Sequence, residues 1–138
     1  LDIKKIVKAS RKYPGEIING MATIENKKDF FNPSIPKVVT KRDGKLLYMS
    51  RGAIPTTKKL GFKKGLKQIC IYAFPVNLLK KFADEESKMP LEELEDIEIL
   101  RFLEMGFDIR MIKLSGNSFA VDTPDDLKKI RKYLRNSF

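Results

Sequence analysis

Histidine and tryptophan are absent from this chain of 138 residues, and cysteine occurs only once. Without histidine the chain has no Ser-His-Asp triad, no imidazole general base and no histidine ligand for a metal. Its single cysteine, Cys70, lies in an apolar run and is expected to be buried. We therefore predict neither a disulfide framework nor a zinc site, and a reducing compartment is the natural setting.

Long apolar stretches and long runs of like charge are also missing. No apolar stretch of about 18 residues and no signal-peptide pattern occurs, so we expect a soluble, cytoplasmic protein with no membrane partner. The formal net charge is +10, from 28 Lys and Arg against 18 Asp and Glu. The basic residues are scattered in pairs, which favours a lysine-rich solvated surface over a basic tail. Phosphates, nucleic acids or acidic small molecules stay possible partners.

Hydrophobic periodicity and turn residues predict one domain of alternating helices and strands. We expect helices over 2–13, 75–83, 91–106 and 124–134, strands over 16–24, 67–74, 107–114 and 119–121, and a polar loop over 26–34. Two β-prone runs around Asp43-Gly44 predict a β-hairpin over 37–50. This order indicates an α/β fold with a mostly parallel sheet and an inserted hairpin.

One carboxylate stands between the last predicted strand and the last predicted helix. Thr123 supplies an N-cap and Pro124 suits the first helical position, so the helix does not need Asp122 in order to begin. Ligands of open α/β sheets lie at the carboxyl ends of strands, and carboxylates there bind Mg²⁺. Asp122 is therefore either an ordinary residue of a helix boundary or a Mg²⁺ ligand.

Three further polar residues stand where a ligand could use them, and each has an ordinary structural alternative. Glu98 is bracketed by Leu94 and Arg101 at helical spacing, so it either pairs with Arg101 or is a semi-buried acceptor for substrate hydroxyls. Arg51 follows a hairpin strand, either as a surface residue or as a planar fork for a ligand carboxylate. Tyr72 lies in an apolar strand, where its hydroxyl needs a partner from the core or from a ligand.

Five segments, in their order along the chain, resemble the C-terminal part of 3-deoxy-manno-octulosonate cytidylyltransferase, also called CMP-Kdo synthetase. They are NPSIPKVV (32–39), DGKLLYMSRGAIP (43–55), KQICIYAF (67–74), PLEELEDIEILRFLEMG (90–106) and AVDTPDDLKKIRKYL (120–134). The resemblance implies an α/β fold with a three-layer, nucleotide-diphospho-sugar-transferase-like (Rossmann-like) mixed sheet and an inserted β-hairpin. It also implies a Mg²⁺-dependent nucleotidyltransferase that converts CTP and a 2-keto-3-deoxy sugar acid to a CMP-sugar and pyrophosphate, for lipopolysaccharide and other cell-surface polysaccharide synthesis.

The resemblance assigns roles by position. Asp122 would be one of two Asp ligands of the catalytic Mg²⁺, Arg51 would contact the sugar acid, and Tyr72 and Glu98 would line the sugar pocket. The region 37–55 would contribute to a homodimer interface, as in the family.

Two sugar-facing positions depart from the family pattern. Gln68 stands where the family usually has a histidine, and Ile99 stands where it usually has a glutamine. Changing a hydrogen-bonding group at a polar site changes which substrate hydroxyls are satisfied. The expected substrate is therefore Kdo or a related acid, such as an amino-deoxy analogue, bound in part by Gln68.

Residues 1–138 are predicted to be the C-terminal, sugar-binding and dimerisation portion of a single cytidylyltransferase domain. The chain begins at Leu1 without Met and enters a helix almost at once, so we expect a piece of something longer. The family's N-terminal, CTP-binding half carries a phosphate loop rich in Gly, Arg and Lys, and no Gly-rich loop follows a strand here. We therefore expect this chain alone to be inactive and not to bind CTP productively.

Two other classes of function stay open. The first is a non-catalytic remnant or dimerisation module of the same fold, which binds no nucleotide. The second is a basic nucleic-acid-binding domain, motivated by the net charge of +10. Scattered lysines, few stacking aromatics and the absence of a recognition motif argue against nucleic acid as a partner.

Overall fold

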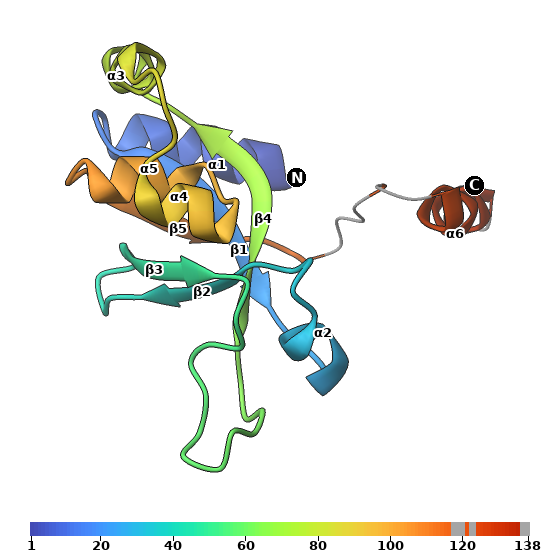
Figure 1. Ribbon diagram of the computed structural model, residues 1–138. Coiled ribbons are helices and arrows are strands. Elements are labelled where there is room, and N and C mark those ends of the chain that lie inside the picture. The colour runs from blue at the N-terminus through green and yellow to red at the C-terminus, as the bar shows by residue number, and fades with distance from the viewer. Residues whose placement is uncertain (117–120, 122–123, 136–138) are drawn as a thin grey trace.

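The computed structural model describes residues 1–116, 121 and 124–135, which contain both helices and strands (Figure 1). The helices are α1 (Asp2–Lys12), α2 (Lys27–Phe31), α3 (Val76–Asp84), α4 (Pro90–Glu95), α5 (Ile99–Glu104) and α6 (Pro124–Arg135), and the strands are β1 (Ile17–Thr23), β2 (Lys37–Thr40), β3 (Leu46–Ser50), β4 (Leu66–Ala73) and β5 (Ile109–Lys113). The strand predicted over 119–121 lies outside the described residues, except for Val121, which is in no strand.

The five strands form one sheet in the order β3-β2-β4-β1-β5. β1 and β5 are parallel, whereas β4 runs antiparallel to β1 and to β2, and β2 and β3 form the predicted hairpin. The mixed α/β fold is thus confirmed, but the expectation of a mostly parallel sheet is wrong. The reason is that the chain returns from the hairpin to β4 through a loop with no crossover helix, and a parallel connection would need such a crossover.

Each face of the sheet is covered by helices, which gives the three layers (Figure 1). Ile17 and Ile18 are consecutive in β1, are both fully buried, and therefore point to opposite faces. Ile17 belongs to the larger core, which α3, α4 and α5 close with residues such as Leu100. Ile18 belongs to the smaller core, which Ile6 and Ala9 of α1 close.

The helix predicted over 91–106 is in fact two short helices, α4 and α5. Asp96 ends α4 in the left-handed region, with φ 50° and ψ 51°, a conformation that Asp tolerates better than most residues. Leu94, two residues before the break, is 82% exposed. Ile97 and Leu100, which follow the break, are buried.

Two other local predictions are corrected. The segment 26–34 is not a continuous polar loop, because Asn26 accepts a hydrogen bond from the Asp29 amide at 2.8 Å and caps the short helix α2. The reason for the helix is Phe30, whose side chain is completely buried. Cys70 is exposed rather than buried, because it lies in an irregular part of β4 that is described below.

The C-terminal helix α6 begins at Pro124, as predicted, and lies to one side of the sheet (Figure 1). It contributes no buried residue. No helix in the described ranges combines the length and apolar character that a membrane span requires.

Candidate functional site

The pairing of β1 with β4 is interrupted at one point, and the interruption organises the polar residues of this region. Asn19 is opposite Tyr72, but the next residue, Gly20, is opposite Ile69, so β4 has two extra residues between these pairs. Such a bulge bends a strand and redirects its side chains. The fully buried Asn19 donates from Nδ2 to the Ile69 carbonyl at 3.1 Å and to the Ile71 carbonyl at 3.2 Å. Its amide thus takes the place of the backbone donors that the bulge displaces.

The bulge brings Gln68 and Tyr72 into contact, although residues four apart in a regular strand lie far from each other. The Nε2 group of the buried Gln68 donates to the Tyr72 hydroxyl at 3.0 Å and to Asn19 Oδ1 at 3.2 Å. Two of the residues predicted for the sugar site are therefore direct neighbours. Asn19 was not predicted from the sequence, although an amide inside the apolar run Ile17–Thr23 is a signal that could have drawn attention to it.

Tyr72 is half-buried at one end of a stack of aromatic rings. Its ring lies 5.4 Å from that of Phe74, which lies 5.3 Å from that of Phe102. Burial raises the pKa of the Tyr72 hydroxyl, and the neighbouring Cys70 side chain and, to a smaller extent, the negative charge of Glu98 contribute in the same direction. The hydroxyl is consequently a neutral hydrogen-bond donor and acceptor throughout the physiological range.

Glu98 is exposed, so the prediction of a semi-buried acid is wrong. The reason is the break between α4 and α5, which leaves Glu98 at the N-cap of α5 instead of inside one long helix. The alternative ion pair with Arg101 is also wrong. Arg101 turns into the protein and binds Glu92 through two hydrogen bonds of 2.5 and 2.9 Å.

Arg51 holds the turn that precedes Glu98. It donates from Nε to the Glu95 carbonyl at 2.5 Å, from Nη2 to the Asp96 carbonyl at 2.8 Å and from Nη1 to the Pro33 carbonyl at 3.2 Å. These bonds use one N–H of each nitrogen, so each Nη group keeps a second N–H. The side chain is 36% exposed. Nη2 also lies 3.6 Å from the Asp96 carboxylate. Arg51 can therefore position the turn and still offer the second N–H of Nη1 to a ligand carboxylate.

A polar cluster that the sequence did not predict lies beside Arg51. The Glu95 carboxylate accepts hydrogen bonds from Ser50 Oγ at 2.6 Å, from the Arg51 amide at 2.8 Å and from the Tyr48 hydroxyl at 3.3 Å. Burial favours the neutral acid, but these hydrogen bonds outweigh it and hold the pKa of Glu95 below its ordinary value. The fully buried Lys37 donates to the Arg51 carbonyl at 2.5 Å, and burial lowers its pKa.

These residues lie in neighbouring rows of the sheet. Ser50, Lys37 and Lys67 are paired across β3, β2 and β4. Arg51 directly follows Ser50, and Gln68 directly follows Lys67. The backbone N–H of Gln68 donates to the Pro36 carbonyl oxygen at 3.0 Å. The structure therefore places Arg51 and Gln68 in one row across the sheet, with Tyr72 hydrogen-bonded to Gln68 along β4. These three residues are called the band of the sheet. The role of each residue toward a sugar stays a prediction.

The metal prediction cannot be placed in the same way. Asp122 lies outside the described residues. Among the residues that are described, no three acidic or cysteine side chains come together as a metal site would require.

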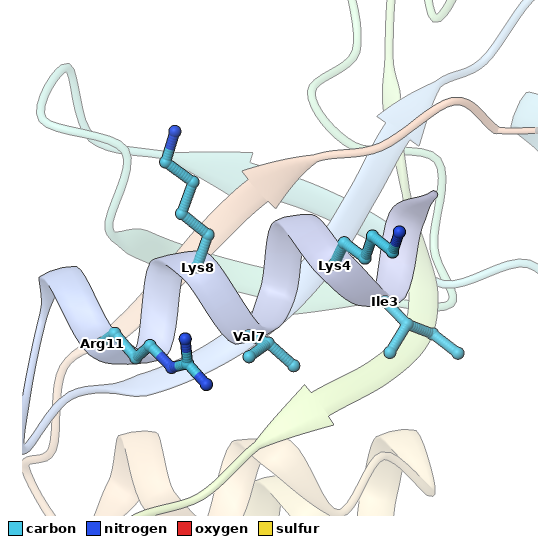
Figure 2. Close-up of a pocket in the computed structure, with 5 residues that line it drawn as sticks. All are labelled: Ile3, Lys4, Val7, Lys8 and Arg11. Carbon is cyan, nitrogen blue, oxygen red and sulfur yellow. The ribbon is translucent and has the colours of Figure 1, made fainter.

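The hollows on the surface lie elsewhere. One of about 420 Å³ is lined by Ile3, Lys4, Val7, Lys8 and Arg11, and Figure 2 shows that all five side chains project from α1. Polar groups from different elements converge in a typical ligand site, whereas here one helix presents its outer face. A second hollow, of about 570 Å³, is lined by four basic residues of α6 alone. Neither contains a residue of the predicted sugar site.

Comparison with known proteins gives a consistent result. The chain is 42% identical over 117 residues to a 3-deoxy-manno-octulosonate cytidylyltransferase of Thermodesulfovibrio yellowstonii, covering 80% of this chain and 46% of that protein. It is 35% identical over 124 residues to the enzyme of the same name from Fusobacterium nucleatum, covering 85% of this chain and 49% of that protein. No family model matches.

A solved structure of CMP:2-keto-3-deoxy-manno-octonic acid synthetase complexed with CTP superposes with a TM-score of 0.89 at 28% identity, covering 99% of this chain and 56% of that chain. The predicted resemblance and the predicted fold class are thereby confirmed. This chain spans about half the length of the curated relatives it matches.

Proposed function

We propose that this chain carries the sugar-acid side of a cytidylyltransferase site. The complete enzyme would join CTP and a 2-keto-3-deoxy sugar acid, Kdo or a related acid, to give a CMP-sugar and pyrophosphate. Such a product would serve cell-surface polysaccharide synthesis, lipopolysaccharide included, in the cytoplasm. The observation that carries the proposal is the fold shared with a solved CMP-Kdo synthetase over 99% of this chain.

The residues on the band of the sheet have the chemistry that a sugar acid requires. A carboxylate is best bound by the planar fork of an arginine. Arg51 keeps an unused N–H on Nη1, and a ligand carboxylate would compete with Asp96 for Nη2. Sugar hydroxyls need both donors and acceptors, which the Gln68 amide and the Tyr72 hydroxyl supply. Glu98, exposed at the start of α5, would accept from a hydroxyl at the rim.

In this proposal the chain's residues act by positioning rather than by covalent chemistry. The anomeric oxygen of the sugar would attack the α-phosphate of CTP, and pyrophosphate would leave. Phosphoryl transfer of this kind depends on orientation and charge neutralisation. Arg51, Gln68 and Tyr72 would hold the sugar acid in one orientation, and neither a histidine nor a reactive thiol is needed.

Mg²⁺ belongs to the proposal through the resemblance alone. It would neutralise charge on the phosphates of CTP, with Asp122 as one of its ligands. The described residues offer no cluster of three or more acidic or cysteine side chains that would hold the ion without Asp122. Binding of Mg²⁺ to Asp122 and formation of a homodimer through 37–55 both stay predictions.

Isothermal titration of the chain with Kdo tests the sugar site. We expect saturable binding that weakens at least about tenfold in Arg51→Ala, because a charge-assisted fork to the carboxylate is lost. Arg42→Ala is the matched control, because Arg42 lies exposed in the hairpin turn and should leave the affinity unchanged. An equal loss in both variants would indicate a general charge effect and contradict the assignment of Arg51.

One observation favours a non-catalytic module of the same fold as the second candidate. All three hydrogen bonds of the Arg51 side chain go to backbone carbonyls, as expected of a purely structural arginine. If no sugar acid binds and sedimentation shows a dimer, the module is the better description.

A further inference from the structure

We infer that Asn19 is a positioning residue for substrate selection: it fixes the Gln68 amide so that the Gln68 carbonyl oxygen faces the sugar acid. The site would then select a sugar acid that presents a hydrogen-bond donor, a hydroxyl or an ammonium group, to Gln68. This inference rests on the proposed function, because it concerns the same sugar site.

The orientation of Asn19 follows from the backbone. Its side-chain amide faces the carbonyl oxygens of Ile69 and Ile71 at 3.1 and 3.2 Å. Carbonyl oxygens only accept hydrogen bonds, so the NH₂ end of Asn19 must point toward them. The reversed amide would place an oxygen against two oxygens in a fully buried position, which costs the desolvation of each unpaired group. Asn19 Oδ1 therefore points toward Gln68.

The orientation of Gln68 follows from that of Asn19. Because Oδ1 of Asn19 only accepts, the NH₂ end of Gln68 must face it, as the distance of 3.2 Å shows. The second hydrogen of the same NH₂ group reaches the Tyr72 hydroxyl at 3.0 Å. Both N–H groups of the Gln68 side chain are thus used inside the protein. The bulge determines the orientation of the Asn19 amide, and Asn19 in turn determines that of the Gln68 amide.

The carbonyl oxygen of Gln68 is left for a ligand. Within the described residues Gln68 makes no hydrogen bond through Oε1, and no buried side-chain oxygen or nitrogen there lacks a partner. Oε1 is therefore open to solvent. Tyr72 accepts from Gln68 and is also hydrogen-bonded with the Cys70 side chain. The group of this pair that is left for a ligand is therefore the Gln68 carbonyl oxygen.

Substituted sugar acids test this selection. The probes are Kdo and, for each ring hydroxyl in turn, the amino-deoxy and the deoxyfluoro analogue, since fluorine resembles a hydroxyl in size but cannot donate. At one ring position we expect the amino analogue to bind at least about tenfold more tightly than the fluoro analogue. In Asn19→Ala that ratio should fall below about threefold, because Gln68 can then reverse its amide.

A second measurement does not depend on Asn19→Ala folding well. In the unsubstituted chain, NMR of the Gln68 side-chain amide should show two protons protected from exchange with water. Tyr72→Phe keeps the ring but removes one acceptor, so one proton should lose its protection. Unprotected Gln68 amide protons in the unsubstituted chain would overturn the inference.

The outcomes separate the two proposals. If Kdo and the other sugar acids fail to bind, the proposed function falls and the inference falls with it. If they bind but the amino and fluoro analogues are equal at every ring position, or if the ratio is the same in Asn19→Ala, the proposed function stands and the inference alone is overturned.

Discussion

Glu95 shows how one side chain can join a helix to a strand and to the residue that follows it. It is the last residue of α4, and its carboxylate accepts hydrogen bonds from the hydroxyls of Ser50 and Tyr48 in β3 and from the backbone N–H of Arg51. Because Arg51 in turn binds the Glu95 carbonyl, the hairpin and the α4–α5 turn hold each other. Loss of the charge on Glu95 should therefore weaken the region that positions Arg51.

The pH dependence of stability tests this role. The pKa of Glu95 in the folded chain lies below its ordinary value of 4.5, so its charge stabilises the fold above that pH and the stabilisation is lost as the pH falls through the folded pKa. We expect Glu95→Gln to lower the free energy of unfolding at about pH 7 and to differ little from the unsubstituted chain near about pH 2. Urea unfolding at the two pH values measures this, and a constant difference would contradict it.

Arg101 and Glu92 form the buried ion pair of the larger core. Their side chains are 10% and 2% exposed, and Arg101 also lies over the Phe82 ring at 3.9 Å. We expect Glu92→Ala to lower the free energy of unfolding by about 3 kcal/mol, because it leaves a buried guanidinium without its carboxylate. The exposed Glu93→Ala is the control and should change it by less than about 0.5 kcal/mol.

A double variant distinguishes the cost of breaking the pair from its net value. Glu92→Met with Arg101→Met removes both charges and should cost less than Glu92→Ala, since no unpaired charge remains. Thermal unfolding of Glu92→Ala, of the control Glu93→Ala and of the double variant gives the three free energies to compare. A double variant that is less stable than the single one would mean that the pair itself stabilises the fold.

At the bulge, Gly20 of β1 lies close to the backbone of β4. A Cβ atom on Gly20 would lie 2.5 Å from Leu114 Cδ1 and 3.0 Å from the Ile69 carbonyl oxygen. We expect Gly20→Ala to lower the free energy of unfolding by about 1–3 kcal/mol, because the backbone of β4 must move away. Gly61→Ala, where the nearest atom is Thr57 Oγ1 at 3.4 Å, is the control in the loop before β4. Equal effects in the two variants would contradict the close approach.

The elements also show what the sequence could and could not predict. The hairpin was predictable because Asp43 and Gly44 determine their own turn, with Gly44 at φ 85°. The break at Asp96 was not, because the carbonyl of Asp96 is held by Arg51, which is 45 residues away in the sequence. The direction of β4 and the role of Asn19 likewise depend on pairing between distant strands, which local patterns do not contain.

For the whole molecule, the sequence was most informative through resemblance. The order of the five segments predicted a fold that the comparison with a solved CMP-Kdo synthetase confirms. The described residues place Gln68 beside Tyr72 and Arg51 in the same row of the sheet as Gln68. Asp122 lies outside them, and Glu98 is more exposed than expected. Whether these residues act on a sugar acid is decided by the titrations proposed above.

We expect that this chain alone does not bind CTP. The resemblance implies a phosphate loop rich in Gly, Arg and Lys, and no Gly-rich segment after a strand of this chain provides one. Calorimetric titration with CTP should therefore show no Mg²⁺-dependent binding in the micromolar range, and UTP serves as the control for non-specific attraction to the basic surface. Micromolar affinity that requires Mg²⁺ and CTP would contradict the expectation.

The exposure of Cys70 has a practical consequence. It is the chain's only thiol, it faces solvent, and it stands between Gln68 and Tyr72 in the bulge of β4. A maleimide fluorophore would therefore attach at a single place, without any engineered cysteine, within two residues of both side chains that are predicted to meet the sugar. The unsubstituted chain thus contains its own attachment point for an optical probe, and quenching of that probe would follow occupancy of the site in real time.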